Sequence, residues 1–135
     1  MYRVTKILHF SYAHRLLNYT GKCKFLHGHN GRLEIDLTSH TLDAHGMVID
    51  FDEIKKRIGQ WIENDLDHKT FLCKDDSLAT LLVKAGEQVL MMEGSPTAEN
   101  MAKFIFDYIT QCGFPATEVR LWETESSYAS YSNIR

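Results

Sequence analysis

The sequence predicts one α+β domain in which helices cover one face of an antiparallel sheet. The chain has 135 residues, a length typical of a single domain. Apolar and polar residues alternate, as in half-buried strands, near both ends of the chain. Amphipathic helical patterns lie between these ends, so strands and helices are segregated along the sequence. No repeat or linker interrupts residues 1–135, which we therefore treat as one domain.

The first half of the chain contains three expected strands and one helix. Residues 2–10 alternate loosely, with Lys6 as the exception, and residues 32–37 alternate cleanly. Residues 47–49 are expected to form a short strand. Residues 51–64 have apolar side chains at helical spacing, after Asp50 as N-cap and with Glu53 three residues later, as in a capping box.

The second half is expected to supply a second long helix and a final hairpin. The helix begins near residues 95–97 and ends before Gly113 and Pro115, which both terminate helices. Residues 118–124 and 128–131 form the hairpin. The stretch between the long helices contains a possible short helix and a possible short strand, at residues 77–85 and 89–92.

Composition and charge exclude several classes of protein. The chain carries 15 Lys+Arg and 18 Asp+Glu, and its net charge of −3 argues against a nonspecific nucleic-acid binder. No apolar run approaches the roughly 20 residues that a membrane-spanning helix needs. The three cysteines are odd in number and widely spaced, which indicates a reducing, cytoplasmic setting instead of a disulfide framework.

Seven histidines in so short a chain point to metal chemistry. His27 and His29 flank Gly28, so in an extended segment both imidazoles lie on one face. They share the parity of the buried positions of the following strand, and two such imidazoles can hold one zinc ion. His14, at the end of the first strand, is the candidate third ligand if the two strands pair.

Cys23, four residues before His27, leaves two interpretations open. Its thiolate is also a good zinc ligand, so a structural site of Cys23, His27 and His29 is possible. Alternatively, Cys23 is a reactive group beside a zinc ion with an open position. The spacing does not decide between them.

Two further positions carry candidate chemistry. Asp67 and His68 follow the first helix; adjacency alone does not make them an orienting pair, but both can face one cleft from a loop and transfer protons there. Glu123 shares the parity of Val119 and Leu121, so its carboxylate lies on an apolar face and needs a donor. A ligand with paired N–H groups would satisfy it.

Six segments together resemble the 6-pyruvoyltetrahydropterin synthase / 6-carboxytetrahydropterin synthase family. They follow the family order across nearly the whole chain. They are Phe-Ser-Tyr-Ala-His at 10–14, Cys-x3-His-Gly-His at 23–29, Met-Val-Ile-Asp-Phe at 47–51, Leu-Asp-His-Lys at 66–69, Pro-Thr-Ala-Glu-Asn at 96–100 and Trp-Glu-Thr at 122–124.

The resemblance implies a fold, an assembly and a metal. The fold would be the tunnelling fold, with a four-stranded antiparallel sheet and two main helices on one face. Three subunits would join their sheets into a barrel, and two trimers would stack as a homohexamer. One zinc ion per subunit would be held by His14, His27 and His29.

The resemblance also implies roles for the remaining site residues. Cys23 would be the catalytic acid or base, working with Asp67 and His68 from a neighbouring subunit. Glu123 would anchor the 2-amino and ring N–H groups of a pterin. Thr97 and Glu99 would lie in or beside the pterin pocket, and Arg15, Lys22 and Lys24 are candidates for binding a triphosphate.

The implied substrate is 7,8-dihydroneopterin triphosphate. The spacing of three residues between Cys23 and His27 resembles the queuosine-pathway enzymes, which release acetaldehyde and triphosphate and leave 6-carboxy-5,6,7,8-tetrahydropterin. The alternatives are 6-pyruvoyltetrahydropterin synthase, which eliminates triphosphate, and a non-catalytic zinc-stabilised pterin-binding module. The stretch at residues 75–93 is longer than in compact members of the family.

Overall fold

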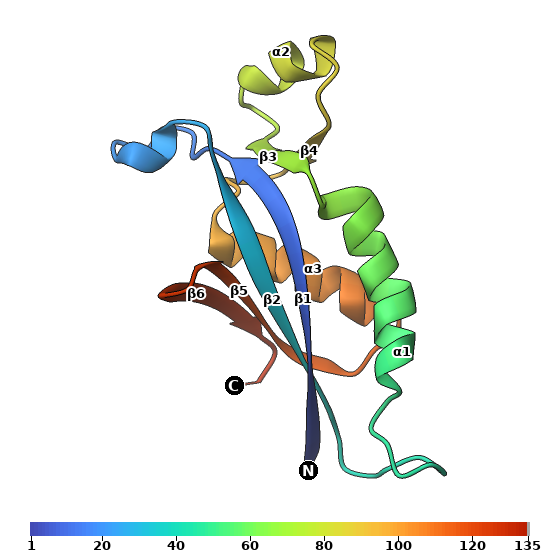
Figure 1. The fold of residues 1–135 in the computed structure, drawn as a ribbon. Coiled ribbons are helices and arrows are strands. Elements are labelled where there is room, and N and C mark those ends of the chain that lie inside the picture. The colour runs from blue at the N-terminus through green and yellow to red at the C-terminus, as the bar shows by residue number, and fades with distance from the viewer. Residues whose placement is uncertain (135) are drawn as a thin grey trace.

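The computed structural model describes residues 1–134 and has an α+β fold built on one six-stranded sheet (Figure 1). The expected α+β class is confirmed. Across the sheet the strands lie in the order β4-β3-β1-β2-β5-β6. Their bounds are Tyr2–His14 (β1), His27–Ser39 (β2), Lys69–Cys73 (β3), Val89–Met92 (β4), Ala116–Thr124 (β5) and Ser127–Ser132 (β6).

The expectation of a four-stranded antiparallel sheet is wrong. β1, β2, β5 and β6 are antiparallel neighbours, but β3 joins the other side of β1 in parallel and β4 joins β3 in parallel. The sheet is therefore six-stranded and mixed. Within β3, Phe71, Leu72 and Cys73 are all buried. Such a short continuous apolar run lacks the alternation that would have marked it as a strand.

The long hairpin of β1 and β2 is the part of the sheet that positions the histidines. Its register runs without a break from Tyr2 opposite Ser39 to His14 opposite His27. Both strands extend beyond the alternating segments recognised in the sequence. The extra residues of each strand are those that carry the candidate metal ligands.

The first long helix covers residues 51–66 and begins, as expected, after Asp50, whose side chain accepts a hydrogen bond from the Asp52 N–H at 2.9 Å. It starts as α1 (Phe51–Ile54) and continues through two π-helical segments, Lys55–Gly59 and Ile62–Leu66. The expected strand at residues 47–49 is wrong. Val48 and Ile49 instead pack against the core from an irregular loop.

The second long helix, α3 (Ala98–Gln111), is confirmed. The Thr97 side chain caps it by accepting from the Asn100 N–H at 3.2 Å. Gly113, with a φ of +89°, takes the left-handed conformation that ends it. One face of α3 is buried against the sheet, through Ala98, Met101, Ala102, Ile105, Phe106 and Ile109.

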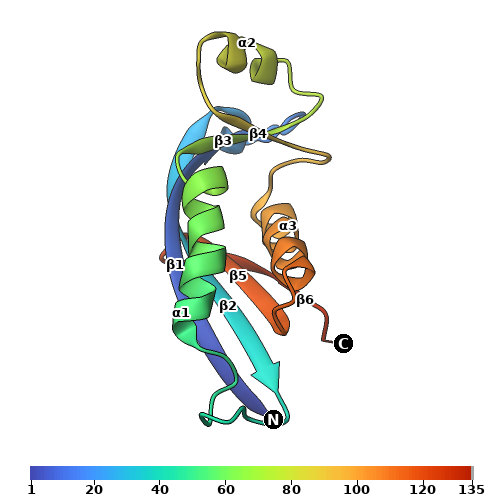
Figure 2. The ribbon, with the colours of Figure 1, turned by 90° about the vertical axis from the view of Figure 1, so that its right-hand side faces the viewer.

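Figure 2 shows the two long helices along one face of the sheet, with the core between the two layers. The short helix α2 (Leu78–Lys84) and strand β4 confirm the expected elements in the variable middle of the chain. Residues 75–93 form a small lobe at one end of the molecule, in which β4 is the edge strand of the sheet and α2 extends beyond it (Figures 1 and 2). None of the helices in the described part of the chain has the length and apolar character needed to cross a membrane.

Candidate metal centre and its surroundings

Three histidines meet at the end of the β1–β2 hairpin where the loop connects the two strands. His14 ends β1 and lies opposite His27 at the start of β2, while His29 lies opposite Tyr12. Residues two apart on a strand project from the same face, so the three imidazoles all point to the helix side of the sheet. One ligand atom from each lies within 4.8 Å of the others. The three predicted ligands are therefore brought together.

Backbone carbonyls orient two of these imidazoles. His14 Nδ1 lies 2.7 Å from the Pro96 carbonyl oxygen, and His27 Nδ1 lies 2.7 Å from that of Phe25. A carbonyl oxygen accepts, so each Nδ1 carries the proton and each Nε2 keeps its lone pair. The two Nε2 atoms lie 3.1 Å apart. Metal-binding histidines in proteins are typically oriented in this way.

The cluster fits a metal ion. Burial lowers the pKa of His14, which favours the neutral imidazole that a metal requires. His29 Nε2 is buried and has no hydrogen-bond partner among the described residues. Three histidines with one further position free is a ligand set of catalytic zinc sites. The donor chemistry therefore matches Zn²⁺.

Cys23 is close to this cluster in sequence but is not part of it. It lies in a single 3-10 turn, Lys22–Lys24, and is half-buried with a free thiol. Its carbonyl accepts from the Leu16 N–H at 2.9 Å, which ties the turn to the end of β1. Within residues 1–134, the group suited to a metal contains His14 and not Cys23.

Asp67 and His68 form a hydrogen-bonded pair although they are sequence neighbours. His68 has a φ of +60°, and this left-handed turn brings its Nδ1 within 2.7 Å of Asp67 Oδ2. The Ser11 N–H donates to Asp67 Oδ1 at 2.8 Å, and the His68 N–H donates to the Ser11 carbonyl at 2.7 Å. β1 thus fixes the loop that carries both side chains.

The environment of this pair suits proton transfer. Burial acts to raise the pKa of Asp67, but the hydrogen bonds from Ser11 and His68 outweigh it and hold that pKa below its usual value. The carboxylate therefore stays charged and orients the ring. The His68 side chain is 80% exposed, so its other nitrogen faces outward.

Glu123 lies beside the histidine cluster. Its Oε2 is 3.7 Å from His29 Nε2, and its side chain is half-buried. Thr97 and Glu99 follow Pro96, whose carbonyl contacts His14. Thr97 is committed to the helix cap, whereas Glu99 is exposed in the first turn.

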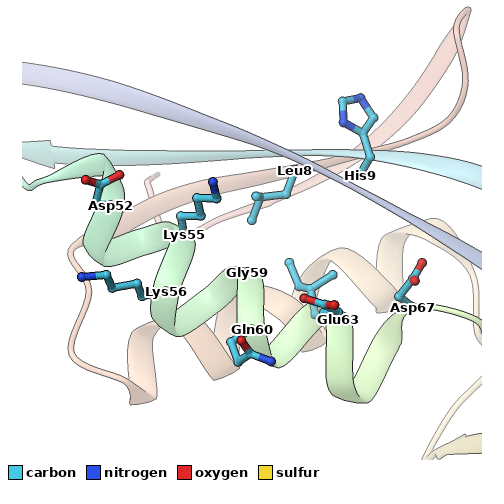
Figure 3. A pocket seen from close by; sticks show the side chains of 10 residues that line it. Leu8, His9, Asp52, Lys55, Lys56, Gly59, Gln60, Glu63 and Asp67 are labelled. Carbon is cyan, nitrogen blue, oxygen red and sulfur yellow. The ribbon is translucent and has the colours of Figure 1, made fainter.

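Two cavities adjoin these residues. One, of about 370 Å³, is lined by residues that include His29 and His68. A larger one, of about 670 Å³, lies between the first long helix and β1, and Figure 3 shows Asp67 at one end of it and Asp52 at the other. The larger cavity does not include the three histidines. We place the chemistry at the histidines, because their donor atoms converge.

Three features of the site were not predicted from the sequence. The carbonyls of Pro96 and Phe25 have no side-chain signature. The ring of Tyr12 packs against His14 and His29, with centroid distances of 5.3 and 5.5 Å. The third feature is that Arg15, a candidate for binding the triphosphate, is instead paired with an acidic side chain of the same chain.

Arg15 forms a bidentate ion pair with Asp76, a residue of the variable middle. Arg15 Nε lies 2.7 Å from Asp76 Oδ2, and Nη2 contacts Oδ1. Asp76 is only 2% exposed. Arg15 is thus occupied and ties the lobe of residues 75–93 to the strand end that carries His14.

A sequence model of the 6-pyruvoyl tetrahydropterin synthase family matches residues 3–133. A 6-carboxy-5,6,7,8-tetrahydropterin synthase of Rickettsia typhi is 34% identical over 95% of this chain and 98% of its own length. An enzyme of the same name from Haemophilus influenzae is 30% identical over 97% of this chain and 99% of its own length.

Solved structures show the same fold. An uncharacterized protein of Wolinella succinogenes superposes with a TM-score of 0.85 at 23% identity and covers 98% of both chains. The 6-pyruvoyl tetrahydropterin synthase of Caenorhabditis elegans superposes with a TM-score of 0.73 at 23% identity, over 98% of this chain and 95% of that one.

Proposed function

Because the chain belongs to the 6-pyruvoyl tetrahydropterin synthase family, we propose that it is a zinc-dependent carbon–carbon lyase acting on 7,8-dihydroneopterin triphosphate. With one water, the substrate yields 6-carboxy-5,6,7,8-tetrahydropterin, acetaldehyde and triphosphate, a step of queuosine biosynthesis. The observation that carries the proposal is the convergence of His14, His27 and His29 beside Glu123. The names of the relatives and the Cys23–His27 spacing favour the 6-carboxy product.

Each residue has a distinct role in this reaction. The three histidines would hold a zinc ion, which would supply Lewis-acid polarisation of the substrate's side-chain hydroxyls. The Cys23 thiolate takes a carbon-bound proton from the same side chain. His68, oriented by Asp67, moves protons at the same side chain. Glu123 accepts two N–H groups of the pterin ring and fixes its orientation.

Thr97 and Glu99, at the start of α3, are proposed to contact the pterin. Glu99 is exposed there and free to contact ligand, whereas the Thr97 hydroxyl oxygen already accepts from the Asn100 N–H. The hydroxyl hydrogen of Thr97 is therefore the part available to a substrate acceptor.

A homohexamer, built as a dimer of trimers, is the proposed assembly, in a cytoplasmic setting. Within residues 1–134, the pairing of β1 with β3 is confined to Tyr12–His14, so the rest of that edge of β1 is open. β6 forms the opposite edge of the sheet. Open edges at both sides allow sheets of neighbouring subunits to join. The outward-facing His68 would then serve a neighbour's site.

Product analysis tests the proposed reaction. Zinc-loaded protein is incubated with 7,8-dihydroneopterin triphosphate, and the products are identified by mass spectrometry. Acetaldehyde with 6-carboxytetrahydropterin is the expected result. 6-Pyruvoyltetrahydropterin would identify the alternative enzyme of the family, and a lack of turnover would contradict both.

Replacing the thiol separates the enzyme from a non-catalytic zinc-stabilised module. The Cys23→Ala variant should keep about one zinc per chain and lose turnover, because three histidines complete the protein's ligand set. Cys112→Ala, at another half-buried cysteine, is the matched control and should keep both properties. Loss of zinc and of folding in Cys23→Ala alone would support the module.

A further inference from the structure

Tyr12 places a hydroxyl group where a phenylalanine would pack equally well. The residue is only 3% exposed. Among the described residues, the buried side-chain polar atoms without a hydrogen-bond partner are Tyr12 Oη and His29 Nε2. These two residues lie directly opposite each other on β1 and β2. Leaving a buried donor unpaired lowers stability, so both atoms point to a function at this place.

A glycine on the neighbouring strand makes room for the Tyr12 ring. A Cβ atom at Gly31 would lie 3.0 Å from Tyr12 Cε1, so the ring passes directly over this position. The ring is held from its other sides by Phe10 and Phe71, with centroid distances of 5.3 and 5.7 Å. The hydroxyl is therefore carried across β2 on a rigid support.

The carboxylate of Glu123 lies on the far side of that glycine. The register of β2 and β5 pairs Arg32 with Trp122, which brings Gly31 next to Glu123. A tyrosine hydroxyl ordinarily has a pKa near 10, so it carries a proton at neutral pH. Tyr12 thus presents a donor on the side where the carboxylate needs one.

We propose that Tyr12 is a positioning residue for Glu123: in the ligand-bound site its unpartnered hydroxyl donates a hydrogen bond to the carboxylate and turns it toward the paired N–H groups of the pterin. When a metal is bound through the His29 Nε2 lone pair, that nitrogen carries no proton. His29 then cannot donate a hydrogen bond to the Glu123 carboxylate, which needs another donor. A carboxylate has about four acceptor sites, enough for the Tyr12 hydroxyl and two ligand N–H groups. The inference rests on the proposed pterin site.

The test is a fluorescence titration of the zinc-loaded protein with neopterin, an oxidised pterin. Tyr12→Phe removes the hydroxyl and keeps the ring. Tyr108→Phe is the matched control, since Tyr108 lies near the other end of α3 and stacks on Trp61 at a centroid distance of 3.7 Å. We expect Tyr12→Phe to weaken neopterin binding about tenfold, with an unchanged or higher melting temperature. Tyr108→Phe should bind like the parent protein.

A double-mutant cycle shows whether Tyr12 acts through the carboxylate. In a Glu123→Gln background, adding Tyr12→Phe should change binding by less than about twofold, because the interacting pair is already broken. Co²⁺-substituted Tyr12→Phe should keep the parent's visible spectrum, since the hydroxyl is not a metal ligand.

The outcomes separate the two proposals. If the parent protein binds neopterin and Tyr12→Phe binds it equally well, or if the two substitutions are additive, the role of Tyr12 is refuted while the pterin site stands. If the parent protein does not bind neopterin, the proposed function fails, and the inference about Tyr12 fails with it.

Discussion

At the scale of single residues, the three histidines differ in how they are held. His14 and His27 are oriented by carbonyls, from Pro96 and Phe25, whereas His29 ends on an unpaired nitrogen beside Glu123. The sequence predicted the imidazoles through their two-residue spacing and their parity. It could not predict the carbonyls, because a backbone acceptor is available at every residue and its position depends on the fold.

Removing one ligand should abolish tight metal binding. His14→Ala is expected to weaken zinc affinity by more than about 100-fold, because the loss of a direct ligand exceeds the effect of losing an outer-shell partner. His45→Ala, at an exposed position, should keep about one zinc per chain. Zinc content after dialysis against a weak chelator measures both variants. Equal retention by the two would place the metal elsewhere.

Arg120 is the centre of an ionic network on the other face of the sheet. It donates to Asp36 twice at 2.8 Å, and also to Glu34 and Glu118. Arg120→Met should lower the free energy of unfolding by about 3–5 kcal/mol, since it leaves the buried Asp36 charge without its cationic partner and with only the Thr5 hydroxyl as a side-chain donor. Arg32→Met, which loses an exposed contact with Glu34, should cost less than about 1 kcal/mol. Urea unfolding compares them, and equal losses would contradict this assignment.

The ion pair between Arg120 and Asp36 makes the free energy of unfolding depend on pH. The hydrogen bonds from Arg120 hold the pKa of Asp36 below its usual value of about 3.9. A lowered native pKa stabilises the fold above the unfolded value and loses that effect as the pH falls. The free energy of unfolding should therefore decline below about pH 5, with a shallower decline in Arg120→Met. Identical slopes in the two proteins would refute the link.

At the scale of elements, the sequence identified the long helices better than the sheet. Residues 98–111 matched their prediction because Thr97, Gly113 and an apolar face all agree. β3 was missed because its buried residues do not alternate, and its partner β1 is 55 residues away in sequence. Residues 47–49 follow an irregular path: Met47 is hydrogen-bonded to Asp43 in a local turn, and Val48 and Ile49 pack against the core without strand pairing.

The cap of α3 is testable at this scale. Thr97→Ala removes the oxygen that accepts from the Asn100 N–H and should destabilise the protein by about 1 kcal/mol. Thr97→Ser keeps an equivalent oxygen and should restore most of the loss. Thermal unfolding followed by circular dichroism gives both values. An unchanged melting temperature in Thr97→Ala would mean that the cap does not stabilise the helix.

At the scale of the whole molecule, the proposed homohexamer would complete the site with residues of two chains. Cys23 lies at one end of the β1–β2 hairpin, and the outward-facing His68 is 80% exposed. In this proposal a length typical of one domain describes the folding unit, and the assembly is the catalytic unit. Six chains of 15.6 kDa correspond to a particle of about 94 kDa, which light scattering on a sizing column can measure.

Mixed assemblies test whether neighbours share a site. Cys23→Ala and His68→Ala variants should each lose turnover, but subunits exchanged between them should regain a fraction of it. Some sites would then combine an intact Cys23 from one chain with an intact His68 from its neighbour. The two variants mixed without subunit exchange are the control. No recovery after verified exchange would place both groups in one chain.

We propose an open zinc site made by three histidines, with the Cys23 thiol left free to react. X-ray absorption at the zinc edge of the loaded protein measures this ligand set directly. The expected first shell contains nitrogen and oxygen at about 2.0–2.1 Å, from three imidazoles and one water. A sulfur ligand at about 2.3 Å that disappears in Cys23→Ala would contradict the claim and make the site structural.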